Sequence, residues 1–307
     1  MGTSKPPANL LDGVTVRILN PEDLESLPRF WIQDVGIPIE LRFIKRWYAS
    51  DPEGFRVAVD SRDRIIGMAS IMKQTDQLYV MGYMGVAKRY RGKGVGRMLL
   101  DNLLARSQPA NCALSASEDK LDMYIRRGFK KVENLSGYSY IGKLNIVKNQ
   151  PPLPLDLDIV HVKPGDALLA EVTAYDATVC GFQRNVELIQ FTEPTSIVLA
   201  VKRQGKVVAY GKVQKYMLGG IWLGPVYGDE MYIASHLIEA LMRQFEKDRS
   251  PFVFAIFSAK AQPIAKSLNL KLVDKLRRCY LDTSPENLPP VKMENVYAFD
   301  DVGFTFL

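Results

Sequence analysis

Residues Gln77–Gln108 read QLYVMGYMGVAKRYRGKGVGRMLLDNLLARSQ, and this stretch contains the pattern that decides the fold. Leu78–Val86 is a nearly unbroken apolar run, which is typical of a strand buried on both faces. A basic, glycine-rich turn follows at Arg91–Gly96. Apolar residues then recur at helical spacing from Val95 to Leu103. The stretch therefore predicts a strand that enters a helix through a glycine turn.

A turn of this kind is suited to an anion. A helix leaves its first N–H groups without partners inside the helix, and here they point into the turn together with the positive end of the helix dipole. Arg91 and Lys93 add two positive charges. We therefore expect Arg91–Gly96 to bind a phosphate or pyrophosphate. The alternative is a tight turn with solvated basic residues, since turns also use glycine for steric reasons.

The spacing of the glycines limits which class of phosphate-containing ligand the turn is expected to bind. It differs from the dinucleotide fingerprint Gly-x-Gly-x-x-Gly, and the Gly-Lys-Ser/Thr ending of nucleotide hydrolases is absent. Arg91, Gly94 and Gly96 instead resemble the Arg/Gln-x-x-Gly-x-Gly/Ala signature of the GCN5-related N-acetyltransferases, the GNAT superfamily. The resemblance implies that acetyl-CoA is the donor substrate. It also implies a cofactor-binding set on the strand and the turn, namely Met84, Val86, Arg91, Gly92, Lys93, Gly94, Val95 and Gly96.

Length and composition predict an intracellular protein of two domains. The 307 residues are about twice a typical domain, and 47% of them are hydrophobic. No apolar run is long enough to span a membrane, so no membrane contact is expected. The three cysteines and two histidines are isolated, which argues against a disulfide framework and against a metal site. A reducing, cytoplasmic location follows.

The positive charge is concentrated in the first half. Residues 1–150 contain 23 Lys and Arg against 16 Asp and Glu, whereas residues 151–307 contain 17 against 18. The basic residues gather on the glycine turn and form no long stripe with interleaved aromatics, so we expect no nucleic-acid partner. A compact polyanion such as CoA explains this placement better.

The first half reads as a mixed α/β domain. Asn20 and Pro21 mark a helix start, and Gly128 closes a later helix. The predicted order is strand 14–19, helices 22–35 and 40–50, strands 55–60, 65–73 and 78–86, the helix after the turn, strand 112–117, helix 120–127 and strand 131–142. This is also the element order of a GNAT domain, so the resemblance extends well beyond the turn.

Tyr124–Phe129 provides a second match, because it resembles the Tyr-x-x-x-Gly-Phe element of the family. The resemblance implies that Tyr124 is the catalytic general acid toward the leaving thiolate of CoA. A phenol with a pKa of about 10 can donate such a proton in a dry site. The alternative is that Tyr124 packs beside Phe129 as an ordinary helix aromatic.

The chain also departs from the family pattern. Ser117 stands where many members have a cofactor-binding Asn, and Leu78–Val86 contains no Glu to act as a general base. The base is then a water chain, Glu118, Asp119 or a residue of the second half. Positioning of thioester and amine remains the main expected source of rate. We expect Ser117 to contact the cofactor and Tyr83 to contact the acceptor.

The second half resembles a diverged YitH-type acetyltransferase domain, so the whole chain resembles a tandem GNAT protein. Its strands and helices repeat the order of the first half after a proline-rich linker. The predicted fold is α/β, with two tandem domains that each have a central mixed β-sheet flanked by helices. The predicted segments are 1–147 for the first domain, 148–157 for the linker, 158–285 for the second domain and 286–307 for an extension.

The second half is not expected to hold CoA. Its equivalent turn, Gly224–Glu230, lacks Arg and alternating glycines, and its two carboxylates would repel a pyrophosphate at the helix start. Asp176 and Arg184 belong to a polar-aromatic segment, YDATVCGFQR, that resembles one common in this domain type. We interpret them as acceptor-binding residues. The alternative is a structural ion pair between them.

Three functions remain open. The leading one is an acetyl-CoA-dependent N-acetyltransferase that transfers the acetyl group directly to the primary amine of a small or amino-acid-like molecule. The second differs in its acceptor, which is a protein or peptide. The third is a CoA-binding regulatory pseudo-enzyme, in keeping with Ser117 and the missing strand carboxylate. The oligomeric state is left open.

Overall fold

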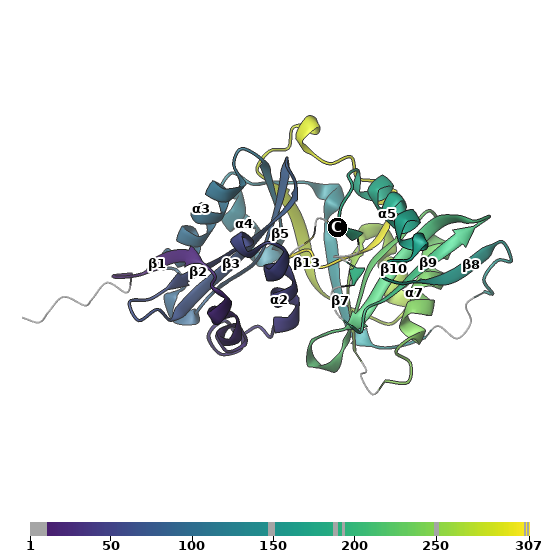
Figure 1. The fold of residues 1–307 in the computed structure, drawn as a ribbon, viewed down its shortest axis with the longest axis horizontal. Helices are drawn as coiled ribbons and strands as arrows, with labels where there is room; N and C mark the ends of the chain where they lie inside the picture. Colours follow the sequence, from purple (N-terminus) through teal and green to yellow (C-terminus); the bar gives the residue numbers. More distant parts are fainter. Residues whose placement is uncertain are drawn as a thin grey trace, which may run out of the picture. The chain divides into compact units, whose positions relative to one another are not determined.

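The computed structural model describes residues 11–146, 151–186, 190–191, 194–248, 252–303, 305 and 307. The chain forms two compact units, residues 1–112 and 113–307, and each is described by itself (Figure 1). Residues 148–150 of the predicted linker lie outside the described residues. Among the helices of the described ranges, none is long and apolar enough to cross a membrane.

The first unit contains an antiparallel sheet in the order β1-β2-β3-β4. Its strands are β1 (Thr15–Ile18), β2 (Phe55–Val59), β3 (Ile65–Thr75) and β4 (Leu78–Val86). Its helical elements are η1 (Pro21–Ser26), α1 (Leu27–Arg29), η2 (Phe30–Val35), α2 (Leu41–Ser50), η3 (Pro52–Gly54), η4 (Lys88–Tyr90) and α3 (Val95–Ser107). The predicted strand, glycine turn and helix are therefore confirmed as β4, the turn and α3.

The first predicted helix, residues 22–35, is divided into three types of turn. A 3₁₀ segment, one short α-helical stretch and a π-helical segment follow one another as η1, α1 and η2. Pro28 lies at the start of α1 and has no N–H to donate, so a regular hydrogen-bond ladder cannot run through it. The predicted helix from residue 40 forms as α2.

Two glycines let helices approach the two faces of this sheet. A Cβ on Gly67 would lie 2.9 Å from Leu99 of α3, and a Cβ on Gly85 would lie 2.7 Å from Trp31 of η2. Gly85 pairs with Met68, the neighbour of Gly67, so the two glycines face opposite sides of the sheet. Helix α3 and η2 therefore cover opposite faces of β3 and β4.

The second unit has a mixed sheet in the order β5-β13-β7-β12-β14-β11-β10-β9-β8. Its strands are β5 (Asn111–Ser117, of which the unit includes residues from Ala113), β6 (Lys130–Lys131), β7 (Gly137–Lys143), β8 (Leu157–Val162), β9 (Ile197–Arg203), β10 (Lys206–Lys215), β11 (Ile221–Gly228), β12 (Phe252–Ser258), β13 (Lys271–Tyr280) and β14 (Val296–Phe299). Its helices are α4 (Leu121–Ile125), α5 (Ala167–Cys180), α7 (Met231–Arg243) and α8 (Gln262–Ser267), and its 3₁₀ turns are η5 (Glu118–Lys120), η6 (Glu133–Leu135), η7 (Met217–Gly219), η8 (Ala259–Ala261), η9 (Pro285–Asn287) and η10 (Met293–Asn295).

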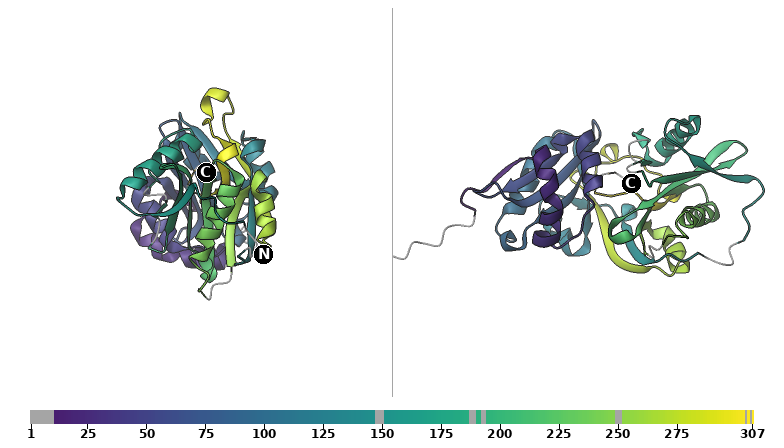
Figure 2. Two further views of the ribbon diagram at one scale, coloured as in Figure 1. Left: turned by 90° about the vertical axis from the view of Figure 1, so that its right-hand side faces the viewer. Right: turned by 60° about the horizontal axis from the view of Figure 1, so that its bottom comes forward.

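Helices α5 and α7 lie on opposite sides of strands β8 to β11 (Figure 2). Apolar residues recur at helical spacing along α7, and Ala234, Leu237 and Leu241 among them are fully enclosed. These side chains join Leu223 and Val253 of the sheet in one hydrophobic core. Burial of this stripe supplies the main stabilisation of the helix.

Two strands, β7 and β13, pair with strands from the other half of the sequence. By sequence β7 follows the elements of the first half, yet it pairs along its whole length with β12. Strand β13 belongs by sequence to the second half, yet Leu276–Tyr280 pairs with Ala113–Ser117 of β5. Its earlier residues pair with β7, and the two strands lie side by side in Figure 1. Strands from the two halves of the sequence therefore pair with one another within the second unit.

Candidate functional site

The turn before α3 has the geometry of an anion cradle. Gly92 and Gly94 adopt left-handed φ angles of 73° and 97°, which other residues rarely adopt. Gly94 is the N-cap of α3, and Met98 donates the first helical hydrogen bond to its carbonyl oxygen at 3.0 Å. Among the described residues, a Cβ on Gly92 would have no atom within 4 Å, and one on Gly94 would meet only Leu11 at 3.9 Å. The described residues therefore leave the space beside these two glycines unfilled, next to the first N–H groups of α3, which have no partner inside the helix.

Arg91 holds the turn in place. Its Nε donates to the carbonyl oxygen of Val86 at 3.0 Å, and its Nη2 donates to that of Val35 at 2.7 Å. The side chain thus ties the turn to the end of β4 and to the end of η2. Lys93 is exposed beside it. Met84, Val86 and the turn Arg91–Gly96 are therefore brought together at one end of the sheet.

Strand β4 has a bulge that the apolar pattern did not reveal. Met68 pairs with Gly85 and Ser70 pairs with Gly82, so Tyr83 and Met84 together face one residue of β3. Tyr83 has a left-handed φ of 48°, and its ring lies edge-on to Trp31 at 6.2 Å. A bulge turns backbone groups out of the ladder and is frequent next to active sites. Positive φ in a tyrosine leaves no signal in the sequence.

Tyr124 and Ser117 belong to the second unit and are placed within it. The Tyr124 ring packs edge-on against Phe129, with 5.9 Å between centroids, and Phe129 donates its N–H to the Tyr124 carbonyl at 3.2 Å. The predicted helix end at Gly128 is confirmed by its left-handed φ of 89°. Ser117 donates its hydroxyl to Asp119 at 2.6 Å. The Tyr124–Phe129 contact fits the alternative in which Tyr124 packs beside Phe129 as an ordinary helix aromatic. The Tyr124 side chain is only partly buried.

The two carboxylates considered as bases are both in ion pairs. Glu118 accepts a hydrogen bond from Arg277 at 2.7 Å, and this bond lowers the pKa of Glu118. Lys120 and then Ser117 lower the pKa of Asp119 in the same way. A lowered pKa makes each carboxylate a weaker proton acceptor. Neither environment favours deprotonation of an ammonium.

The corresponding turn of the second half is occupied by its own side chains. Asp229 accepts hydrogen bonds from the Tyr175 hydroxyl at 2.8 Å and from Asn295 at 3.0 Å. Glu230 is the N-cap of α7 and forms an ion pair with Arg203 at 2.9 Å. The start of α7 is therefore surrounded by acidic side chains that already have partners.

Strand β11 repeats the bulge of β4. Gly211 pairs with Val226 and Val213 pairs with Leu223, so Gly224 and Pro225 face one residue of β10. Beyond this point β14 lies between β11 and β12 and pairs with both. A Cβ on Gly224 would lie 2.1 Å from the carbonyl oxygen of Phe299, so this close approach requires glycine. The chain itself therefore covers the edge of β11 after the bulge.

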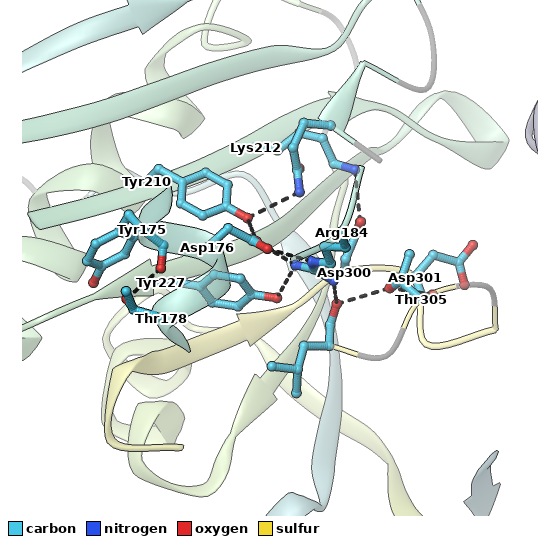
Figure 3. A network of polar contacts seen from close by, with 12 residues as sticks. Tyr175, Asp176, Thr178, Arg184, Tyr210, Lys212, Tyr227, Asp300, Asp301 and Thr305 are labelled. Atoms are coloured by element: carbon cyan, nitrogen blue, oxygen red, sulfur yellow. Dashed lines mark hydrogen bonds and ion pairs between the residues drawn. The ribbon is translucent and has the colours of Figure 1, made fainter. Parts of the chain in front are cut away.

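Asp176 and Arg184 form a buried ion pair (Figure 3). Nε and Nη2 of Arg184 donate to the two carboxylate oxygens, each at 2.8 Å. Tyr210 donates its hydroxyl to Asp176, and Nη2 of Arg184 also donates to the Tyr227 hydroxyl at 3.0 Å. Burial alone would lower the pKa of Arg184, but attraction to Asp176 outweighs it and raises that pKa. The ion-pair alternative thus describes the geometry, and an acceptor role stays a prediction.

A second buried ion pair lies close to this network. Nζ of Lys212 contacts Asp300 at 2.8 Å, and both side chains are almost fully enclosed (Figure 3). Lys212 is the residue of β10 that faces the β11 bulge. Among the described residues, no group of three or more His, Cys, Asp or Glu side chains is arranged to hold a metal ion.

These features define an α/β protein with two similar halves, one of which has a helix turn suited to a phosphate. The sequence profile described as "Acetyltransferase (GNAT) family" matches residues 22–129, and the profile described as "Acetyltransferase (GNAT) domain" matches residues 172–298. The chain belongs to the GNAT acetyltransferases and contains two such domains. The YitH type of the second domain stays a prediction.

Solved structures share this fold at low sequence identity. A Pyrococcus horikoshii protein described as an acetyltransferase is 17% identical, with 99% of this chain and 100% of that chain covered and a TM-score of 0.76. A tandem GNAT protein from the clavulanic acid biosynthesis pathway is 12% identical, with 88% and 99% covered and a TM-score of 0.67. The glucosamine N-acetyltransferase region of a fungal β-N-acetylglucosaminidase is 14% identical, with 87% and 38% covered and a TM-score of 0.62. A comparison with curated proteins gives no match.

Proposed function

We propose that the protein is an acetyl-CoA-dependent N-acetyltransferase whose acceptor is the primary amine of a small molecule. The observation that carries the proposal is the open, left-handed glycine turn at the start of α3. It would bind the pyrophosphate of CoA through the N–H groups of Val95 and Gly96, with Lys93 as the nearby cation. The backbone at the β4 bulge, including Met84, would then orient the thioester.

In the proposed reaction the acceptor nitrogen attacks the thioester carbonyl carbon. The C–N bond forms, the C–S bond breaks, the thiolate of CoA takes the phenolic proton of Tyr124, and solvent water then returns a proton to the phenolate. The proton released by the amine passes to solvent water, since β4 contains no carboxylate and Glu118 and Asp119 have lowered pKa values. The reaction therefore depends mainly on positioning.

The second domain is proposed to hold no CoA. The carboxylates at the start of α7 and the strand β14 beside β11 support this assignment. Asp176 and Arg184 would contact an acceptor only if their buried pair opened.

A regulatory pseudo-enzyme is the second candidate function. The ion-paired state of Glu118 and Asp119 favours it, because a chain without an available base would be a poor catalyst. The test is a thiol-release assay with acetyl-CoA over amines, amino acids, glucosamine and peptides. Release with a small amine supports the proposal, and release with peptides alone identifies a protein acetyltransferase. Tight CoA binding without release on any acceptor favours the regulatory function.

Tyr124→Phe is expected to lower turnover about a hundredfold, because the leaving thiolate loses its proton donor. The KM for acetyl-CoA should stay within about twofold, since the phosphate turn is unchanged. Tyr232→Phe is the matched control, since it removes one hydroxyl from an exposed tyrosine of α7. Steady-state kinetics would measure both variants. An unchanged kcat in Tyr124→Phe would remove this residue from the mechanism.

A further inference from the structure

The segment that carries Tyr124 is held at both of its ends by one strand of the other half. Helix α4 has only five residues, so its flanks decide its direction. Before it, Ser117 of β5 pairs with Leu276 of β13. After it, Lys130 of β6 pairs with Tyr280 of the same strand. Strand β13, which comes from the second half of the sequence, therefore holds the chain both before and after α4.

One side chain of β13 reinforces this attachment. Nε of Arg277 donates to Glu118 at 2.7 Å, and its Nη1 lies 3.9 Å from Glu133. Glu118 opens the turn η5 that leads into α4, and Glu133 opens η6 after β6. Arg277 thus contacts one carboxylate on each side of the Tyr124 segment. Its side chain is 16% exposed, whereas those of the two carboxylates are 54% and 70% exposed.

We propose that Arg277 is a positioning residue for acetyl transfer. It holds the segment that carries Tyr124 in place against strand β13. The inference rests on the proposed function, in which Tyr124 is the proton donor. A planar guanidinium can bind both carboxylates at once, whereas an ammonium is a single point charge. Because the carboxylates are exposed, the ion pairs contribute little to global stability. Loss of Arg277 should therefore affect turnover more than unfolding.

The test is a double-mutant cycle in kcat between Arg277→Ala and Tyr124→Phe. Arg277→Ala is expected to lower kcat about tenfold, because the proton donor is misplaced, with the KM for acetyl-CoA unchanged. In the Tyr124→Phe background it should cause no further loss, since there is no proton left to position. Arg277→Lys should recover part of the loss. Lys271→Ala, which removes the same charge from the far end of β13, should retain the wild-type kcat.

Additive losses in the cycle would overturn the positioning role and leave Tyr124 as the acid. An unchanged kcat in Tyr124→Phe alone would instead refute the acid role and, with it, this inference. Hydrogen exchange gives a readout that needs no acceptor. Amides of residues 118–129 should exchange about tenfold faster in Arg277→Ala, while those of α7 stay unchanged. Unchanged exchange in residues 118–129 would also overturn the proposal.

Discussion

Gly94→Glu is expected to abolish acetyl-CoA binding. Gly94 is the N-cap of α3 with a left-handed φ of 97°, and the nearest atom of the described residues to a Cβ there would be in Leu11, 3.9 Å away. A glutamate would place its carboxylate where the pyrophosphate is expected to lie, at the positive end of the helix dipole. We expect the Kd for CoA, measured by titration calorimetry, to rise at least about a hundredfold.

Gly205→Glu provides the matched control. Gly205 lies in the turn between β9 and β10 and has a left-handed φ of 81°, and a Cβ there would have no atom of the described residues within 4 Å. The control variant therefore carries the same backbone strain, about 1–2 kcal/mol, and the same added charge. It should bind CoA like the wild type. CoA binding that survives in Gly94→Glu would refute the assignment of Arg91–Gly96 as the cofactor turn.

The parts of the structure that could be predicted from the sequence depend on local patterns. The turn Arg91–Gly96 was predictable because glycine spacing reports directly on backbone conformation. The core face of α7 was predictable because burial of a helix follows a period of 3.6 residues. The strands β2, β3 and β4 were predictable from alternating or continuous apolar runs, whereas the predicted helix 22–35 is divided into η1, α1 and η2, and the predicted strand 131–142 is divided into β6 and β7 by η6.

The parts that could not be predicted depend on contacts between residues distant in the chain. The pairing of β13 with β5 joins Leu276 to Ser117, and no local spacing reports on such a partner. The bulge at Tyr83 is formed by register against β3, while its own residues continue an ordinary apolar run. Arg277 looks like one of several solvated basic residues until its strand partner is known.

The pairing of β13 with β5 and β6 links the second half of the sequence to the segment that carries Tyr124. The second half lacks the glycine turn, and its β11 edge is covered by β14. Its strand β13 nevertheless supplies the partner for both flanks of the Tyr124 segment. If the proposed function holds, the second half of the sequence would therefore contribute to turnover by positioning Tyr124, even without a CoA site of its own.

Asp176→Asn is expected to be strongly destabilising. The substitution leaves the Arg184 guanidinium buried without its counter-charge, which typically costs about 3–5 kcal/mol in the free energy of unfolding. Urea unfolding followed by the fluorescence of Trp222, the one tryptophan after residue 112, would measure the loss in the second unit. Glu246→Gln is the matched control. Glu246 forms an ion pair with Arg243 in which the side chains are 53% and 49% exposed, and its loss should cost no more than about 0.5 kcal/mol.

The double variant Asp176→Asn/Arg184→Gln separates a structural role from an acceptor role. It contains no unpaired buried charge, so it should be more stable than Asp176→Asn alone, even though the hydroxyls of Tyr210 and Tyr227 lose charged partners. If the pair were built to bind the acceptor, Asp176→Asn would keep near-wild-type stability and raise the KM for the acceptor. That outcome would contradict the structural role. A large loss of stability that the double variant partly restores would instead identify the pair as part of the folded core.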